Sequence, residues 1–230
     1  MSETVETVRN WKDREAETLS SGVQEYSLLD TEESVADRLR TRVLTVDTDT
    51  EFEPERFDGE VFYHVLAGNG LLHGATADRS EPVLLETNTG GWLPGTRTHR
   101  FENTGEGPLR CLAVSCDTDG DYDASDGTMQ KLGSVATESR HDDVWKGYDV
   151  EDSKRLALAG YQALAADDEL GEHSHDEEIS YLIRGEGKLA IGGVEHELTG
   201  GTAMHVPAET SHNLISTGTD QFGYIVIEVA

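Results

Sequence analysis

The stretch "GEHSHDEEISYLIRGEGK" (residues 171–188) places two histidines and three acids between residues 173 and 178, ahead of an apolar run and a Gly-x-Gly turn. Residues i and i+2 of an extended segment point to the same face, so His173 and His175 can direct both imidazoles toward one interior. Glu178 begins the following strand, where its carboxylate can face the same point. Farther along the chain, a proline turn precedes His212. Together these four side chains predict a metal site.

Neutral imidazole nitrogens and carboxylate oxygens suit borderline divalent transition metals. A set of three histidines and one glutamate accepts Fe, Mn, Ni, Co, Cu or Zn, so the residues leave the identity of the metal open. Four protein ligands on an octahedral ion leave two positions for substrate, water or dioxygen, as a catalytic metal requires. We therefore expect one divalent transition metal per chain.

The spacing of these residues resembles the two sequence motifs of the cupin superfamily. The first cupin motif runs Gly, His-x-His, three or four residues, Glu, six residues, Gly. The second runs Gly, five residues, Pro-x-Gly, two residues, His, three residues, Asn. The matching residues of this chain are His173, His175, Glu178, Gly185, Gly201, Pro207 and His212, whereas Glu209 and Ser216 replace the second motif's Gly and Asn. The resemblance implies that His173, His175, Glu178 and His212 bind the metal.

The identity of the carboxylate ligand stays open at this point. The gap between His175 and Glu178 is one residue shorter than the motif, so Glu177 competes with Glu178 as the fourth ligand. We favour Glu178 because it keeps six residues before Gly185.

The two halves of the chain repeat each other. "VFYHVLAGNG" (61–70) matches "ISYLIRGEG" (179–187) when Gly68 is set on Gly185, and "PGTRTH" (94–99) matches "PAETSH" (207–212). An internal duplication of a β unit indicates two similar domains.

The first half lacks most of the ligands. Its counterpart of the His-x-His stretch, "FEPERFDGEV" (52–61), holds no histidine, and only His99 matches a ligand of the second half. We expect no metal there; a site rebuilt from Glu60, His64, His73 and His99 is the less favoured alternative, since strand parity points His64 away from the barrel centre.

From Arg42 onward, short β-rich runs alternate with turns rich in Gly, Asn and Asp. This pattern is typical of an all-β sandwich or barrel. Combined with the resemblance, this predicts an all-β fold of two tandem cupin jelly-roll barrels (a bicupin) with short N-terminal helical segments. Helices are expected over 2–20, from the spacing of apolar residues, and over 32–40, where Asp30 and Glu33 form a capping-box pattern.

The expected domains are a helical extension (1–41), a degenerate barrel without a metal site (42–116), an acidic linker (117–140) and a metal-binding barrel (141–230).

Strand parity also selects neighbours of the metal site. Ser180 shares its face with Glu178 and should line the pocket, whereas His205 should lie on an outer sheet face or at an interface. Tyr161, Gln162 and Tyr224 are candidate hydrogen-bond donors from neighbouring strands, but packing is the role that we favour for each.

The amino-acid composition limits the kinds of molecule that the chain can bind. The chain carries 46 acids against 18 bases, for a net charge of −28, and no basic patch could offset repulsion by nucleic-acid phosphates. Few lysines and many dispersed acids resemble the proteomes of salt-in halophilic archaea; an ordinary acidic cytosolic protein is the alternative.

The sequence has no 18-residue apolar run and no signal-peptide pattern, so we expect a cytoplasmic protein away from membranes. Cys111 and Cys116 should be buried on opposite strand faces, without a disulfide.

The function expected from the resemblance is a metal-dependent dioxygenase acting on a small oxygenated or phenolic compound. A redox-neutral isomerase or hydrolase is the main alternative, and a non-catalytic module that binds a small molecule or stores metal is a third. Association into a homodimer is also expected from the family.

Overall fold

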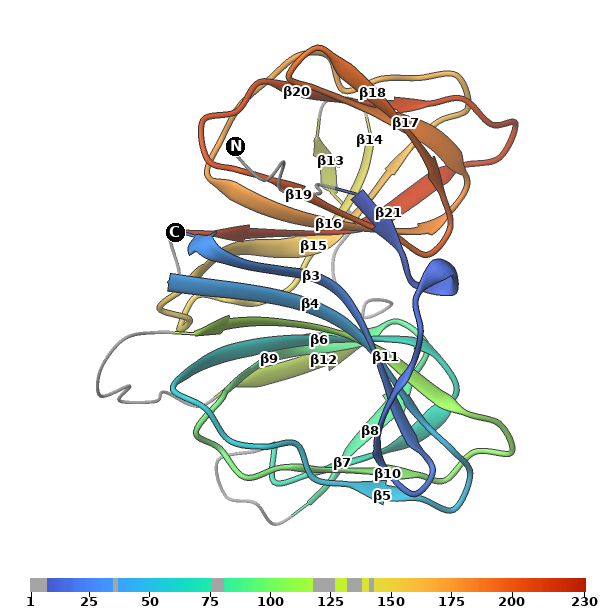
Figure 1. The fold of residues 1–230 in the computed structure, drawn as a ribbon, viewed down its shortest axis with the longest axis vertical. Coiled ribbons are helices and arrows are strands. Elements are labelled where there is room, and N and C mark those ends of the chain that lie inside the picture. Colours follow the sequence, from blue (N-terminus) through green and yellow to red (C-terminus); the bar gives the residue numbers. More distant parts are fainter. Residues whose placement is uncertain (1–7, 35–36, 76–80, 118–126, 132–137, 141–142) are drawn as a thin grey trace.

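The structure, a computed structural model, describes residues 8–34, 37–75, 81–117, 127–131, 138–140 and 143–230. It consists almost entirely of β-strands, arranged as two barrels stacked on each other (Figure 1). This confirms the predicted all-β fold of two jelly-roll barrels. Among the described residues, no helix has the length and apolar character needed to cross a membrane.

Each barrel pairs one seven-stranded sheet with a smaller sheet. In the N-terminal barrel, the large sheet has the order β12-β9-β6-β11-β4-β3-β2 and the small sheet the order β5-β10-β7-β8. These strands are β2 Glu17–Ser20, β3 Val23–Ser34, β4 Asp37–Val46, β5 Glu51–Phe52, β6 Gly59–Ala67, β7 Asn69–His73, β8 Val83–Glu86, β9 Thr89–Pro94, β10 Arg100–Asn103, β11 Leu109–Asp117 and β12 Thr128–Lys131.

In the C-terminal barrel, the large sheet has the order β1-β19-β16-β21-β15-β14-β13 and the small sheet the order β18-β17-β20. The strands are β1 Val8–Asn10, β13 Glu138–Arg140, β14 Asp143–Gly147, β15 Leu156–Leu164, β16 Glu177–Arg184, β17 Glu186–Ile191, β18 Val194–Thr199, β19 Thr202–Val206, β20 His212–Ser216 and β21 Phe222–Val229.

The repeat seen in the sequence has a structural counterpart at its two glycines. Gly68 and Gly185 have φ angles of +87° and +91°, a backbone conformation that residues with a Cβ rarely adopt. A Cβ at Gly185 would also approach the Gln221 carbonyl oxygen to 2.9 Å. Both glycines therefore mark the same sharp turn in the two barrels.

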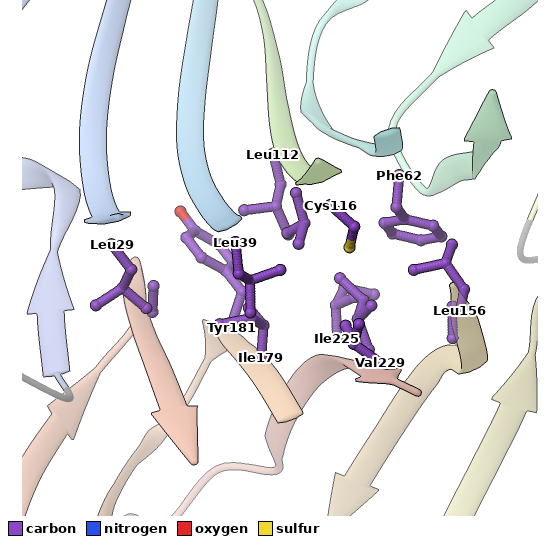
Figure 2. Packing of buried hydrophobic residues seen from close by; sticks show 14 of the residues in the cluster. Leu29, Leu39, Phe62, Leu112, Cys116, Leu156, Ile179, Tyr181, Ile225 and Val229 are labelled. Carbon is purple, nitrogen blue, oxygen red and sulfur yellow. The ribbon is translucent and has the colours of Figure 1, made fainter. Parts of the chain in front are cut away.

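The large sheets of the two barrels face each other and bury an apolar layer between them (Figure 2). Ile179, Ile225 and Val229 of the C-terminal barrel pack in one cluster with Phe62 and Leu112 of the N-terminal barrel. These strands are buried on both faces, which explains their nearly continuous apolar sequences.

A buried carboxylate also joins the barrels. Glu60 of β6 is fully buried and accepts hydrogen bonds from the Ser153 hydroxyl, from the Lys154 backbone N–H at 2.8 Å and from the Arg155 backbone N–H at 3.2 Å. These donors precede β15 of the other barrel, so Glu60 fixes the chain where it enters the C-terminal barrel.

The helix predicted over 2–20 is wrong for residues 8–20, and residues 1–7 lie outside the described part. Val8–Asn10 forms β1, which pairs with β19 so that Val8 lies opposite Met204. The Trp11 backbone N–H then donates to the Gly201 carbonyl at 3.2 Å, at the start of a three-residue 3-10 helix, Trp11–Asp13. Pairing with an open sheet edge outweighs the weak local preference for helix.

The helix predicted over 32–40 is also wrong in its described residues, because β3 and β4 form a long hairpin there. The Arg38 guanidinium donates to both carboxylate oxygens of Asp30 across the hairpin, at 2.8 and 2.6 Å. Asp30 therefore serves a cross-strand ion pair instead of a helix cap. Along β4, Leu39 and Val43 face the other barrel while Leu44 and Val46 face the interior of their own, a period of two.

Much of the predicted acidic linker, 117–140, lies outside the described residues. Two strands fall within its described part: β12 pairs with β9 of the N-terminal barrel, and β13 pairs with β14 of the C-terminal barrel. The division at residues 42, 117 and 141 stays a prediction.

Both cysteines are buried and free. Cys111 belongs to the core of the N-terminal barrel and Cys116 to the layer between barrels, as strand parity predicted. Burial raises the pKa of the Cys111 thiol to about 12, so this thiol is inert at neutral pH.

Candidate metal centre

Three predicted ligands meet at one end of the C-terminal barrel. His173 and His212 form an isolated antiparallel bridge, with backbone hydrogen bonds of 3.1 and 3.0 Å between them. Their ring centroids lie 4.3 Å apart, and those of His175 and His212 lie 4.9 Å apart. One nitrogen of each of the three rings lies within 4.8 Å of the others. The fold thus gathers the His-x-His segment and the distant histidine into one cluster.

The hydrogen bonds of the three rings fix which nitrogen is available. A carbonyl oxygen can only accept, so each Nδ1 that contacts one must carry the hydrogen, which leaves Nε2 as the ligand atom. The three Nδ1–H groups donate to Gly171 O at 2.8 Å (from His173), Asp176 O at 2.7 Å (from His175) and Thr210 O at 3.0 Å (from His212).

His212 provides the clearest sign of a missing partner. Its Nε2 is buried and has no hydrogen-bond partner among the described residues. Burial also lowers the pKa of this imidazole, which keeps it neutral. A buried, neutral nitrogen without a partner fits a metal ligand.

Glu178 lies beside the histidines at the start of β16 and is 5% exposed. Its Oε2 lies 3.0 Å from the His175 Nε2, and its Oε1 accepts a hydrogen bond of 2.5 Å from the Ser180 hydroxyl. Burial alone would raise the pKa of this carboxyl, but the hydrogen bonds from His175 and Ser180 outweigh burial and lower it. Glu178 is therefore a carboxylate at neutral pH.

The ion pair acts on His175 in the opposite direction. The hydrogen bond to Glu178 raises the pKa of His175 to about 9, against the opposing effect of burial. In the metal-free chain this ring therefore holds a proton on the nitrogen that would bind a metal.

The structure separates the two neighbouring glutamates. Glu177 points to the opposite face of β16, into the space between barrels, where its Oε1 lies 2.7 Å from the His205 Nε2. Both side chains are almost fully buried. Glu178 is thus the carboxylate beside the three histidines, and His205 lies at the inter-barrel interface, as parity predicted.

Glu228 is a neighbour that the sequence analysis missed. It lies directly opposite Glu178 in the pairing of β16 with β21. One oxygen of its carboxylate lies within 4.8 Å of ligand atoms of both His175 and Glu178. The signal that could have found it is an acid within the apolar run "YIVIEVA" (224–230). Glu228 has the same strand parity as Tyr224, and a charged residue is rarely buried in such a run without a partner.

A cavity of ≈ 140 Å³ adjoins the cluster, with room for about five water molecules at roughly 30 Å³ each. Its lining residues are Trp145, Leu158, Gln162, Leu170, His173, His175, Glu178, Tyr224, Val226 and Glu228. The cavity therefore suits a small compound that meets apolar walls and a few polar groups.

The predicted neighbours divide between the two faces of the sheet. Ser180 contacts Glu178, and Gln162 and Tyr224 line the cavity. Tyr161 packs, which is the favoured role, and its candidacy as a donor near the metal site is wrong. It lies on the other face of β15, packs against the inter-barrel layer and accepts a hydrogen bond of 2.9 Å from Arg184. It does not line this cavity.

The N-terminal barrel has filled the equivalent position. His99, which matches His212, donates through Nδ1 to the Arg97 carbonyl at 2.9 Å, and its Nε2 accepts a hydrogen bond of 3.0 Å from the Tyr63 hydroxyl. Tyr63 stands where the repeat places Ser180 in the other barrel. The Tyr63 hydroxyl therefore hydrogen-bonds to the Nε2 atom of His99 that a metal would need.

The alternative site of Glu60, His64, His73 and His99 is not assembled. Glu60 contacts the chain before β15, His64 lies 2.9 Å from the Tyr148 hydroxyl between the barrels, and His73 pairs with Glu102 at 2.7 Å on the small sheet. The expectation that His64 points away from the barrel centre is confirmed.

Comparison with known proteins agrees with this architecture. Residues 160–228 match the family described as Cupin domain. The uncharacterized protein MJ1618 of Methanocaldococcus jannaschii is 26% identical over 98 residues, which are 43% of this chain and 74% of that protein. AerE from Microcystis aeruginosa superimposes with a TM-score of 0.77 at 11% identity, over 97% of this chain and 99% of AerE. A mutant of Bacillus subtilis oxalate decarboxylase OxdC gives 0.75 at 10% identity, over 99% of this chain and 78% of that chain. Residues 160–228 are thus similar to a cupin domain, and the chain as a whole shares the two-barrel jelly-roll fold of these solved structures.

Proposed function

We propose that the C-terminal barrel holds one divalent transition metal through His173, His175, Glu178 and His212, and that the chain is an enzyme acting on a small compound in the adjoining cavity. The observation that carries this proposal is the convergence of three Nε2 atoms and a buried carboxylate at the wall of a small cavity. The orphaned Nε2 of His212 supports it independently.

When bound, such a metal would supply Lewis-acid chemistry and, if it is redox-active, electron transfer to oxygen-containing substrates. The chain itself supplies the environment. Ser180 holds Glu178 in place and in its ionised form. Leu158, Leu170 and Val226 line the apolar part of the cavity and exclude water, which strengthens polar interactions inside.

The reaction that we propose first is oxygen-dependent cleavage of a small oxygenated or phenolic compound. The cavity has room for a compound of that size, and its apolar walls with Trp145 and Tyr224 suit a phenolic ring. The test is a screen of small phenols, diketones and ureido compounds with an oxygen electrode, using protein loaded with iron, manganese or nickel. Oxygen uptake that needs both a substrate and an intact His212 is expected, and His212→Ala is the matched control.

Glu228 favours a second candidate, a redox-neutral isomerase or hydrolase. A second carboxylate beside Glu178 is placed to take a proton from a substrate in the cavity and return it. Turnover under strict anaerobiosis, lost in Glu228→Gln while the metal content stays at the wild-type level, would select this reaction over the dioxygenase. Tight binding of a compound without turnover in any condition would instead indicate a non-catalytic binding module.

A further inference from the structure

The cavity beside the candidate metal centre is lined by carboxylates but, among the residues that the structure describes, by no arginine or lysine. Its charged side chains are Glu178 and Glu228, apart from the imidazoles of His173 and His175. Once these imidazoles are neutral metal ligands, the described lining offers no cationic side chain to a substrate. The charge of the site is then set by the two glutamates and by the metal.

Glu228 places the second negative charge at the metal end of the cavity. It lies directly opposite Glu178 in the pairing of β21 with β16, so the two side chains leave the sheet on the same face. One carboxylate oxygen of Glu228 lies within 4.8 Å of ligand atoms of both His175 and Glu178. A substrate that reaches the metal must therefore pass close to this carboxylate.

The formal charges at this end of the barrel balance when a divalent metal is bound. The two carboxylates and the dication cancel, since the histidines bind as neutral imidazoles. An anionic substrate would leave one uncompensated negative charge, and a cationic substrate one positive charge, beside the apolar walls of Leu158, Leu170 and Val226. Enclosing an unpaired charge next to apolar walls is costly. An uncharged compound leaves the balance undisturbed.

The polar groups of the wall also suit an uncharged compound. Gln162 and Tyr224 lie opposite each other in the pairing of β15 with β21, are both buried, and line the cavity. An amide and a phenol form hydrogen bonds without adding charge, and the Glu228 carboxylate can only accept one. We propose that Glu228 determines substrate specificity at this site: it excludes anions, so the substrate enters uncharged, with an O–H or N–H group that donates to Glu228.

This inference rests on the proposed function and adds the charge of the substrate to it. The test uses three phenols of similar shape that differ in charge at neutral pH: salicylamide is uncharged, salicylate is an anion, and 2-(aminomethyl)phenol is a cation. Each is titrated by calorimetry at pH 7 into the full chain loaded with Ni²⁺, after elemental analysis has established the metal content. Salicylamide should bind about tenfold or more tighter than either charged probe.

A substitution then assigns this preference to one residue. Glu228→Gln keeps the shape of the side chain and removes its charge, so it should tighten the binding of salicylate about tenfold or more and weaken that of 2-(aminomethyl)phenol. Binding of salicylamide should stay within about threefold, because the Gln carbonyl still accepts a hydrogen bond. The matched control is Glu197→Gln, which removes the same charge from an exposed position of β18 and should change none of the three affinities.

The outcomes separate this inference from the proposed function. A wild-type chain that takes up no metal would refute the proposed function before any probe is added. With one metal bound, three results would each overturn the inference alone: salicylate or the cation binding as tightly as salicylamide, an unchanged affinity for salicylate in Glu228→Gln, or no binding of any probe. Retained metal and salicylamide binding show that Glu228→Gln is folded; if it does not fold, the order of the three affinities in the wild-type chain decides.

Discussion

Metal uptake by the C-terminal barrel should displace a proton from His175. Its hydrogen bond to Glu178 raises the pKa of His175 to about 9, so only about 1% of the chains carry this ring in its neutral form at pH 7. A metal binds neutral imidazole and must compete with that proton. The apparent affinity should therefore rise about tenfold per pH unit between about pH 7 and 8.5 and level off above about 9.

The stability of the metal-free chain should change in the opposite direction. A pKa raised by folding means that the protonated ring stabilises the folded state. This contribution is complete below the ordinary histidine pKa of about 6.5 and is lost as the pH rises through about 9. Raising the pH should thus favour metal binding while it removes the His175–Glu178 ion pair from the metal-free form.

Calorimetry of Ni²⁺ binding in buffers of different ionisation enthalpy counts the displaced protons. Close to one proton per metal is expected from His175 at pH 7.5, and about three-quarters of a proton at pH 8.5. In Glu178→Gln the pKa of His175 should return toward about 6.5, so the count at pH 7.5 should fall to about a tenth. An affinity that is flat between pH 7 and 8.5, with no proton released from the wild-type chain, would refute this reasoning.

The remaining predictions concern the site, the inter-barrel layer and the surface. His212→Ala should reduce the metal content from one equivalent per chain to near zero by elemental analysis, while Tyr63→Phe in the other barrel should keep one; two equivalents in the wild type would contradict a single site. Ile179→Ala, in the fully buried inter-barrel layer, should cost about 2–5 kcal/mol in urea unfolding, whereas the exposed Val194→Ala should stay within about 0.5 kcal/mol; equal effects would show that the layer contributes little. If the acids are an adaptation to high salt, the melting temperature should rise steeply from low to molar KCl, because screening shortens from about 10 Å at 0.1 M to about 3 Å at 1 M; a flat dependence would favour an ordinary acidic protein.

The ligand cluster could be predicted because its information is local. His173 and His175 share a face at i and i+2, and the spacing from Pro207 to His212 sets a turn and the start of a strand. Those patterns are enough to direct side chains to one interior once the barrel closes. The structure brings all three histidines and Glu178 together, as the motif spacing predicted.

The errors came from residues whose surroundings depend on distant partners. Val8 and Trp11 have helical spacing, but the sheet edge that captures this segment lies almost 200 residues away in the chain. Along β15, Leu156 and Ala159 face one side while Leu158 and Leu164 face the other. A strand that is apolar on both faces has no alternation from which to assign a face, so its tyrosine could not be placed. Glu228 was missed for the same reason.

The pairing of β1 with β19 also sets the order in which the molecule can be completed. β1 leaves the ribosome before every strand of the N-terminal barrel, yet its partner is made only near the end of synthesis. The early segment must therefore wait while one barrel forms, and the sheet edge at β19 stays open until it returns. Since β19 pairs on its other side with β16, which carries Glu178, the closing strand is one step from the candidate metal centre. Cutting the chain between the two barrels would leave the C-terminal piece with the ligands but without the strand that seals their sheet.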